Sequence, residues 1–367
     1  MHSPLSTSSW TLDWGRCAEG EPAEIFRALV TENVVFSTSG TTGEPIGWSR
    51  TPQQLWSEAE VVARAIGATV EGSHPDSVIS FAPPSHLYGM MATVLLASKL
   101  RVPITYVAPG DRPPVLAADG RYIVAAIPPT FATLFNPAIG WISPKQMTVI
   151  HSTAVLPAIG DYFARGFTDE QRLVEIFGST ETGAVATRTH GLDEPDWTLC
   201  SDVDFADPVD LADPGRAKEE RLLGVRSPRL AHRGSDGPSE AARRQLTYQT
   251  GDYITRTGAR TFRFAGRRER LLKVNGRRID LDRLEHRLQS VVADGDVACV
   301  PTLDHVRGEG FDVVVAAGLT LNMAALQRCL ADFSVTPRQI RRVDSIPRSA
   351  TGKRLRLAPA RVAEVDP

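Results

Sequence analysis

The sequence predicts an α/β fold, with a large layered αβ N-terminal domain and a small α+β C-terminal domain. Two observations carry this prediction. Up to residue 177, short apolar runs rich in β-branched residues alternate with stretches of helical length. From residue 266 the pattern changes to a compact set of helices and strands, long enough to fold separately. We therefore expect domains at 1–265 and 266–367.

The elements of the larger domain follow from hydrophobic periodicity. A helix is expected near residues 55–66, because its apolar side chains recur at helical spacing. A short buried strand is expected before it, at 33–37. The remaining strands are short apolar runs separated by polar stretches, at 78–81, 103–107, 122–127, 148–150, 173–177 and 221–225.

In the C-terminal domain, the first expected helix carries Leu281, Leu284 and Leu288 on a single face. The other elements expected there are strands at 297–302, 311–317 and 340–343 and a helix at 323–333.

Composition excludes several classes of protein. The chain has 41 basic and 43 acidic residues, a net charge of −2, which gives no electrostatic reason to expect nucleic-acid binding. No apolar run is long enough to span a bilayer, and the N-terminus lacks the pattern of a signal peptide. Four widely spaced cysteines without a CxxC pair suit a reducing compartment. We therefore expect a cytoplasmic protein with no membrane span and no nucleic-acid partner.

One loop, residues 37–47 (STSGTTGEPIG), combines five hydroxyl side chains with three glycines. Glycines allow close backbone approach, and N–H groups and hydroxyls then bind phosphate oxygens. It is not a P-loop, because no Lys-Ser/Thr pair follows Gly43. On its own, such a loop is more often an ordinary surface loop than a phosphate site.

Four further segments follow this loop along the chain: 177–183 (FGSTETG), 248–252 (YQTGD), 266–279 (GRRERLLKVNGRRI) and 347–353 (PRSATGK). In this order, all five resemble the motifs of the adenylate-forming superfamily, which includes acyl-CoA synthetases, aryl-acid ligases, luciferases and peptide-synthetase adenylation domains. The resemblance extends from about residue 34 to residue 356. Segments 82–89 (APPSHLYG) and 126–130 (AIPPT) look like two more family segments, the first of them beside the acyl pocket.

The resemblance implies a role for each matching residue in nucleotide binding. Phe177 would stack on adenine beside Gly178, Thr180 would bind the α-phosphate, and Glu181 would hold Mg²⁺. Asp252 would bind the ribose hydroxyls, with Arg267 close by. The loop over the β- and γ-phosphates would be formed by Thr38, Ser39, Gly40, Thr41, Thr42 and Gly43.

The same resemblance implies the catalytic and transfer residues. Lys353 would reach the carboxylate and the α-phosphate as the catalytic lysine, together with Thr180 and Glu181. Glu269 would be the hinge between the domains, which would make the small C-terminal domain mobile. The acyl pocket would include His86, Tyr88 and Gly89, and the tunnel for the thiol arm would include Lys273 and Gly276.

Adenylation explains why these residue types would be needed. A carboxylate must attack an anionic α-phosphate, so charge repulsion and positioning oppose the reaction. Mg²⁺ and a lysine offset the repulsion. The implied reaction uses ATP to convert a carboxylic acid to acyl-AMP with release of pyrophosphate. The acyl group then passes to coenzyme A or to the phosphopantetheine arm of an acyl or aryl carrier protein.

Each assignment has a purely structural alternative. Phe177 would otherwise be a core aromatic, and Asp252 a turn residue after Gly251. Lys353 would be a solvated lysine, His86 a structural histidine, and Glu269 a solvated residue in an arginine-rich run. The context of the motifs favours the functional role most strongly for Lys353, since the chain has only five lysines.

The sequence also departs from the family pattern. Ile46 stands where the family usually has a lysine, and 151–157 (HSTAVLP) stands in place of a glycine-rich segment. Relatives have a sizeable region before the phosphate loop, which here begins at residue 37. We therefore expect an unusually short member whose exposed apolar surface is either made polar or covered by another chain, such as the second copy in a homodimer.

The substrate is expected to lack an α-amino group. Residues 81–91 (FAPPSHLYGMM) contain no acidic side chain, and an unpaired buried ammonium would be costly. This favours an aryl or fatty acid over an amino acid. The alternative is a degenerate, non-catalytic adenylate-binding scaffold or regulatory partner. Retention of the motif residues, Thr180, Glu181, Asp252, Lys273 and Lys353, favours the enzyme.

Overall fold

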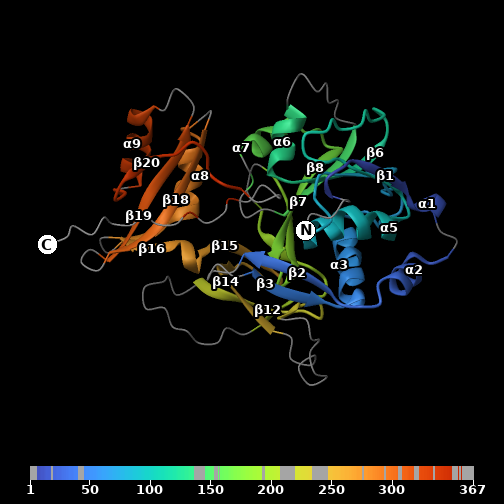
Figure 1. The fold of residues 1–367 in the computed structure, drawn as a ribbon. Helices are drawn as coiled ribbons and strands as arrows, with labels where there is room; N and C mark the ends of the chain where they lie inside the picture. Colours follow the sequence, from blue (N-terminus) through green and yellow to red (C-terminus); the bar gives the residue numbers. More distant parts are fainter. Residues whose placement is uncertain are drawn as a thin grey trace. The chain divides into compact units, whose positions relative to one another are not determined.

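The computed structural model confirms a mixed α/β fold (Figure 1). The chain forms two compact units, residues 1–250 with 255–263 and residues 251–254 with 264–367. Of Thr38, Ser39, Glu269 and Lys273 only the backbone is described. The structure describes residues 6–17, 20–39, 45–135, 145–152, 156, 158–191, 195–206, 220–233, 247–274, 277–292, 295–304, 308–317, 322–333, 335–348, 354 and 357.

A group of five parallel strands forms the centre of the first unit, in the order β5-β4-β6-β7-β8. Two antiparallel strands, β1 and β9, pair with the two ends of this group. Their bounds are β1 Trp10–Asp13, β4 Ser77–Ser80, β5 Pro103–Tyr106, β6 Arg121–Ala126, β7 Gln146–His151, β8 Gln171–Ser179 and β9 Gly183–Thr189.

The sheet continues beyond β9 in the order β10-β15-β14-β12-β11. Strands β14 and β15 each contribute residues to both units. Their bounds are β10 Trp197–Leu199, β11 Asp204–Ala206, β12 Glu220–Arg226, β14 Thr247–Arg256 and β15 Thr261–Arg267.

Helix α3 (Pro52–Ala65) confirms the predicted amphipathic helix. It begins with a capping box, in which Gln54 N donates to Thr51 Oγ1 (3.1 Å) and Thr51 N donates to Gln54 Oε1 (2.9 Å). Its predicted apolar face is buried. Shorter helices precede and follow it, at α1 Trp14–Cys17, α2 Pro22–Leu29, α4 Leu87–Gly89, the π-helix Met90–Leu95 and α5 Leu96–Leu100.

Helices α6 (Pro128–Phe135) and α7 (Ala158–Arg165) pack on the parallel strands. Side chains alternate between the two faces of a strand, so one residue in two points toward these helices. Phe131, Leu134 and Phe163 of the helices share a buried cluster with Ile79, Val124, Val149 and Leu173 of the strands. This packing holds the carboxyl ends of the strands in register.

The strand expected at 33–37 is only partly buried, which corrects the sequence prediction. Strand β2 (Val34–Ser39) pairs with β3 (Pro45–Arg50), which also pairs with β13 (His232–Arg233) in a separate three-stranded sheet. One face packs on α3 through Phe36 (4% exposed), whereas Val35 on the other face is 47% exposed. The strand therefore belongs to a small sheet covered on one side rather than to the large sheet.

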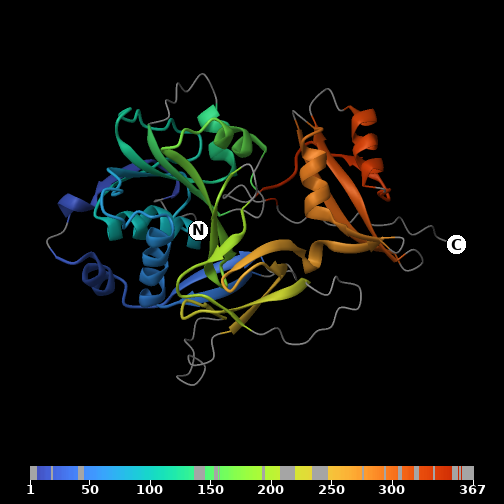
Figure 2. The same cartoon turned by 180° about the vertical axis from the view of Figure 1, so that it is seen from behind.

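The second unit contains the helices and strands predicted after residue 266 (Figure 2). Strands β18 and β19 pair antiparallel and β20 is parallel to β19, while β16 and β17 form a hairpin. Helices α8 and α9 bury leucines against β18 and β19. The bounds are β16 Leu271–Val274, β17 Arg277–Asp280, α8 Leu281–Gln289, β18 Gly295–Asp304, β19 Gly308–Ala317, α9 Met323–Asp332 and β20 Ile340–Arg342.

Candidate active site

Four of the singled-out segments follow the carboxyl ends of neighbouring parallel strands. Residues 81–89 follow β4, 127–130 follow β6, 152–156 follow β7, and the turn with Thr180 and Glu181 follows β8. The register pairs Ala126 with His151 and His151 with Glu175, so β6 and β7 end level with each other and β8 continues beyond them to Ser179. Open α/β sheets bind ligands at this edge. The structure therefore brings the predicted acyl and α-phosphate segments to one edge of the first unit.

Tyr88 ties the predicted acyl segment to this edge. Its hydroxyl donates to the carbonyl oxygens of Ile150 (2.8 Å) and Ala126 (3.2 Å), and burial raises its pKa well above the usual value. A Cβ on Gly89 would lie 1.8 Å from Pro83 O, so the segment folds back closely enough to require glycine. Tyr88 is thus an uncharged side chain that connects this segment to the ends of β6 and β7. His86 is half-buried just before α4.

Phe177 is half-buried within an aromatic group. Its ring centroid lies 5.4 Å from that of Trp197 and 5.7 Å from that of Phe262. A Cβ on the next residue, Gly178, would lie 2.0 Å from Gly183 O, so β8 and β9 approach too closely for a larger residue. The ring therefore has a fixed aromatic support, which is compatible with the core role and with stacking on adenine.

The turn that carries Thr180 and Glu181 is closed by its own side chains. Ser179 N donates to Thr182 Oγ1 (3.1 Å), and Thr182 N lies 3.3 Å from Ser179 Oγ, to which it donates. Gly183, with φ +71°, ends the turn in a conformation that favours glycine. These bonds fix the backbone around the two predicted catalytic residues, whose side chains are half-buried.

Neighbouring elements hold the same turn from outside. Arg50 Nη2, at the end of β3, donates to Thr180 O at 3.0 Å, and Ala231 N donates to Glu181 O at 2.8 Å. Arg50 Nη1 also donates to Arg229 O. Because β3 directly follows the predicted phosphate segment, Arg50 connects that hairpin to the Thr180–Glu181 turn.

A buried network of charges, which the sequence analysis missed, supports this arrangement. Glu58 Oε1, on α3, accepts from Ala184 N at 2.6 Å, and Glu58 Oε2 forms an ion pair with Arg229 Nη1. Arg229 Nη2 donates to Ala184 O (2.7 Å), and its Nε donates to Asp202 Oδ2 (2.7 Å). Arg50, Glu58 and Arg229 are each at most 3% exposed. Glu58 and Arg229 therefore hold the start of β9 through the backbone N–H and carbonyl groups of Ala184.

Burial and neighbouring charges shift the pKa values of the two arginines in this network. Burial lowers the pKa of Arg50 to about 10, although Glu58 and Glu181 oppose the shift. Burial also opposes the charge of Arg229, yet Glu58 and Asp202 raise its pKa above the usual value. Both guanidinium groups stay charged at neutral pH. One sequence signal was available, because Glu58 interrupts the apolar face of α3 and a buried glutamate requires a partner.

A second buried cluster lies at the ends of β7 and β8. Arg188 Nε donates to Glu175 Oε1 at 2.8 Å, and His190 Nε2 lies 2.9 Å from Asp161 Oδ1. His151, fully buried, lies 3.7 Å from Glu175. Burial lowers the pKa of His151 to about 4, whereas the carboxylates of Glu175 and Asp161 raise that of His190. Burial opposes ionisation of Glu175, but the bond to His190 and nearby charges lower its pKa to about 2.

The second unit contains the predicted ribose-binding pair. Asp252 is 9% exposed and follows Gly251, which has φ +78°. Arg267 Nε lies 3.3 Å from Asp252 Oδ1. Arg267 therefore lies close to Asp252, as expected from the sequence.

Several predicted residues lie outside the described part of the chain: Gly40, Thr41, Thr42, Gly43, Gly276 and Lys353. Among described residues, no group of three or more His, Cys, Asp or Glu side chains could hold a metal ion. A single carboxylate such as that of Glu181 is compatible with a Mg²⁺ site, because that ion is commonly held by one or two carboxylates together with water and substrate phosphates. No helix in the described ranges is long and apolar enough to cross a membrane.

Comparisons with known proteins agree with this arrangement. Residues 33–209 match the AMP-binding enzyme family model. Novobiocin biosynthesis protein H from Streptomyces niveus is 26% identical over 347 residues, which cover 87% of this chain and 55% of the relative. The chain thus spans about half the length of that curated relative.

Two solved structures share the fold. ATP-bound MatB from Rhodopseudomonas palustris has a TM-score of 0.65 at 18% identity, covering 87% of this chain and 66% of that one. The o-succinylbenzoate CoA synthetase of Bacillus subtilis, in complex with its acyl-adenylate intermediate, has a TM-score of 0.65 at 17% identity, covering 88% and 67%. The family model thus matches just under half of this chain, and the two solved structures show the same fold.

Removing the charge of Glu58 tests the buried network. Glu58→Gln leaves Arg229 with a buried charge that only Asp202 balances, so we expect a loss of about 3 kcal/mol in the free energy of unfolding. Glu60→Gln, two residues along the same helix, removes a half-exposed ion pair with Lys99 and should cost less than about 1 kcal/mol. Urea unfolding measures both, and equal losses would contradict the assigned role of Glu58.

The neutral His151 predicts a loss of stability in acid. Burial lowers the pKa of His151 to about 4. Its contribution to the free energy of unfolding is therefore complete above pH 6.5 and is lost as pH falls toward 4. The pKa of His190 is raised and that of Glu175 is lowered to about 2. The contributions of these two residues to the free energy of unfolding therefore stay nearly constant between pH 6.5 and 4.5. Over this range the chain should lose about 2–3 kcal/mol through His151. Urea unfolding of His151→Gln should lack this loss; an identical slope with pH would exclude His151 as its source.

Proposed function

We propose that the chain is an AMP-forming acid–thiol ligase. It would convert a carboxylic acid and ATP to acyl-AMP and pyrophosphate, then transfer the acyl group to a thiol with release of AMP. The main support is the convergence of the segments after β4, β6, β7 and β8 at one edge of the first unit, in a chain whose residues 33–209 match the AMP-binding enzyme family model. In this proposal, the acyl-binding residues and the residues that bind the α-phosphate share that edge.

The described residues supply the fixed parts of such a site. The Thr180 hydroxyl would donate to the α-phosphate, and its backbone is held by Arg50. Phe177 would support adenine, and Asp252 would accept hydrogen bonds from the ribose. Mg²⁺ bound at Glu181 would supply positive charge to the phosphates. Lys353 would add a second positive charge at the reacting oxygens.

The acyl-binding residues favour an acid without a charged amino group. The residues around Tyr88 are apolar and include Phe81, Ile127, Phe131 and Leu156. Residues 81–91 carry no acidic side chain. An ammonium would lose its hydration here without a partner in that segment. We therefore propose an aryl or fatty acid as the substrate, and coenzyme A or the phosphopantetheine arm of a carrier protein as the acceptor.

Acyl-AMP formation tests this proposal. Pyrophosphate release and hydroxamate trapping should detect activity with some member of a panel of aryl, short, medium and long acids. Lys353→Ala should reduce the rate on the order of 10²–10³-fold, because it removes one cation from the reacting phosphate. If no acid exceeds that variant, the scaffold alternative replaces the ligase. Activity with amino acids alone would refute the proposed acyl pocket.

The two half-reactions should separate at Gly276. In Gly276→Trp a bulky side chain would block the proposed tunnel for the thiol arm while leaving acyl-AMP formation intact. Acyl-AMP formation and thioester formation from supplied acyl-AMP should be measured separately, with Gly258→Trp, in a turn of the first unit, as the control. Equal loss of both half-reactions in Gly276→Trp would contradict the tunnel.

A further inference from the structure

Two arginines flank the segment that ends in Lys353. Arg348 and Arg354 form an isolated antiparallel β-bridge, so the backbone at these two positions runs side by side. Residues 349–353 lie between them in the sequence and outside the described part of the chain. Contacts that hold Arg348 and Arg354 therefore hold the two described residues on either side of the predicted catalytic lysine in the sequence.

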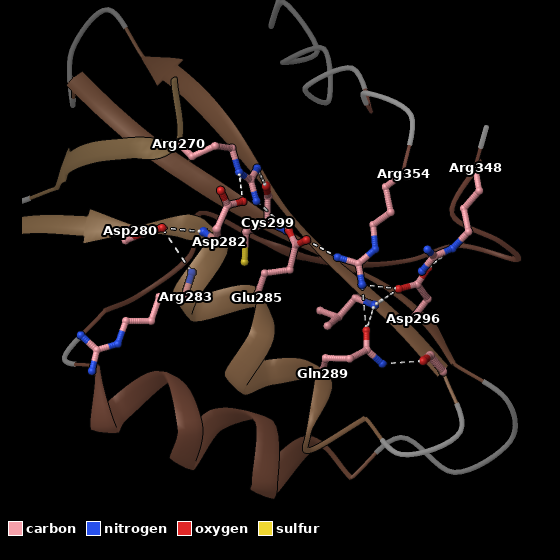
Figure 3. Close-up of polar contacts among 12 residues, drawn as sticks. Arg270, Asp280, Asp282, Arg283, Glu285, Gln289, Asp296, Cys299, Arg348 and Arg354 are labelled. Carbon is pink, nitrogen blue, oxygen red and sulfur yellow. Dashed lines mark hydrogen bonds and ion pairs between the residues drawn. The ribbon is translucent and has the colours of Figure 1, made fainter. Parts of the chain in front are cut away.

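One carboxylate binds both arginines (Figure 3). Asp296 Oδ2, on β18, accepts from Arg348 Nη2 at 2.5 Å and from Nε at 3.1 Å. Asp296 Oδ1 accepts from Arg354 Nη2 at 2.6 Å. The Asp296 side chain is 19% exposed and that of Arg354 is 24% exposed. This geometry differs from an isolated surface ion pair, because one partly buried carboxylate is shared by two guanidinium groups.

Helix α8 completes the attachment of Arg354. Its Nη1 forms an ion pair with Glu285 Oε1, and its Nη2 donates to Gln289 Oε1 at 2.9 Å. Gln289 is itself fixed, since its Nε2 donates to Gly295 O at 2.8 Å. The arginine is therefore held by side chains that are bound in turn to the backbone of β18.

The same network reaches the residue after the predicted hinge. Glu285 Oε2 accepts from Cys299 N at 2.8 Å and from Arg270 Nη2 at 2.8 Å, and Arg270 follows Glu269 in the sequence. Arg270 Nη1 also donates to Cys299 O at 2.6 Å. Figure 3 shows these side chains meeting between α8 and β18. Arg270, Glu285, Arg354, Asp296 and Arg348 thus form one continuous set of contacts within the second unit.

We propose that Asp296 is a positioning residue for acyl-AMP formation. It would hold Arg348 and Arg354, the two described residues that flank the segment with Lys353 in the sequence, together against α8 and β18. This inference rests on the proposed function, in which Lys353 serves the first half-reaction. A fixed attachment lowers the conformational entropy that a mobile lysine would lose on reaching the phosphate. Small misplacements of a reacting group cost up to about 100-fold in rate.

Asp296→Asn in the full chain tests the proposal, since it removes the shared charge and keeps the size. Asp282→Asn is the matched control: Asp282 is 21% exposed and pairs with Arg270, but among the described contacts it binds neither Arg348 nor Arg354. Acyl-AMP formation with an active acid should fall about 10- to 100-fold in Asp296→Asn. Thioester formation from supplied acyl-AMP should stay at the wild-type rate, and Asp282→Asn should retain both activities.

Backbone hydrogen exchange of a peptide covering 345–357 gives a readout that does not depend on activity. It should be faster in Asp296→Asn than in wild type or Asp282→Asn. Unchanged exchange, unchanged acyl-AMP formation, or equal loss of both half-reactions would overturn the role of Asp296. If wild type forms no acyl-AMP with any acid, the proposed function fails. Exchange then decides separately whether Asp296 holds the two arginines.

Discussion

The ion pair between Glu58 and Arg229 is the constraint on which the proposed adenylation site depends. It joins helix α3 to the start of β9, and Ala184 is bound through both its N–H and its carbonyl group. The turn with Thr180 and Glu181 lies immediately before this point and is held by Arg50. A buried pair of charges is costly to desolvate, so it persists only with good geometry and further hydrogen bonds. Here those bonds go to the N–H and the carbonyl oxygen of Ala184, at the start of β9, just after the predicted catalytic turn.

In both units, arginines hold the chain close to predicted functional residues. In the first unit Arg50 donates to Thr180 O and Arg229 donates to Ala184 O; in the second, Asp296 binds Arg348 and Arg354. The chain has 41 basic residues, and only five are lysines. Arginine suits such contacts because its planar group donates several hydrogen bonds in fixed directions and keeps its charge when buried. This use of arginine gives a structural meaning to the unusual composition.

Periodicity and motif order predicted the mixed α/β fold and the amphipathic helix α3. They wrongly predicted that the strand β2 is buried, because exposure of Val35 depends on which sheet the strand joins. They also missed Arg50 and Arg229, since an arginine in a local sequence gives no indication that it is buried beside a distant glutamate. Contacts between residues more than a hundred positions apart arise only from the tertiary fold.

The most direct test is a crystal structure of the chain with a non-hydrolysable acyl-adenylate analogue, a benzoyl sulfamoyl adenosine. The account predicts that the adenine lies against Phe177, the sulfamate beside Thr180, and the ribose hydroxyls on Asp252. The benzoyl group should lie at the edge formed by the segments after β4 and β6. An analogue bound away from these residues, or no binding of the analogue, would contradict the proposed site.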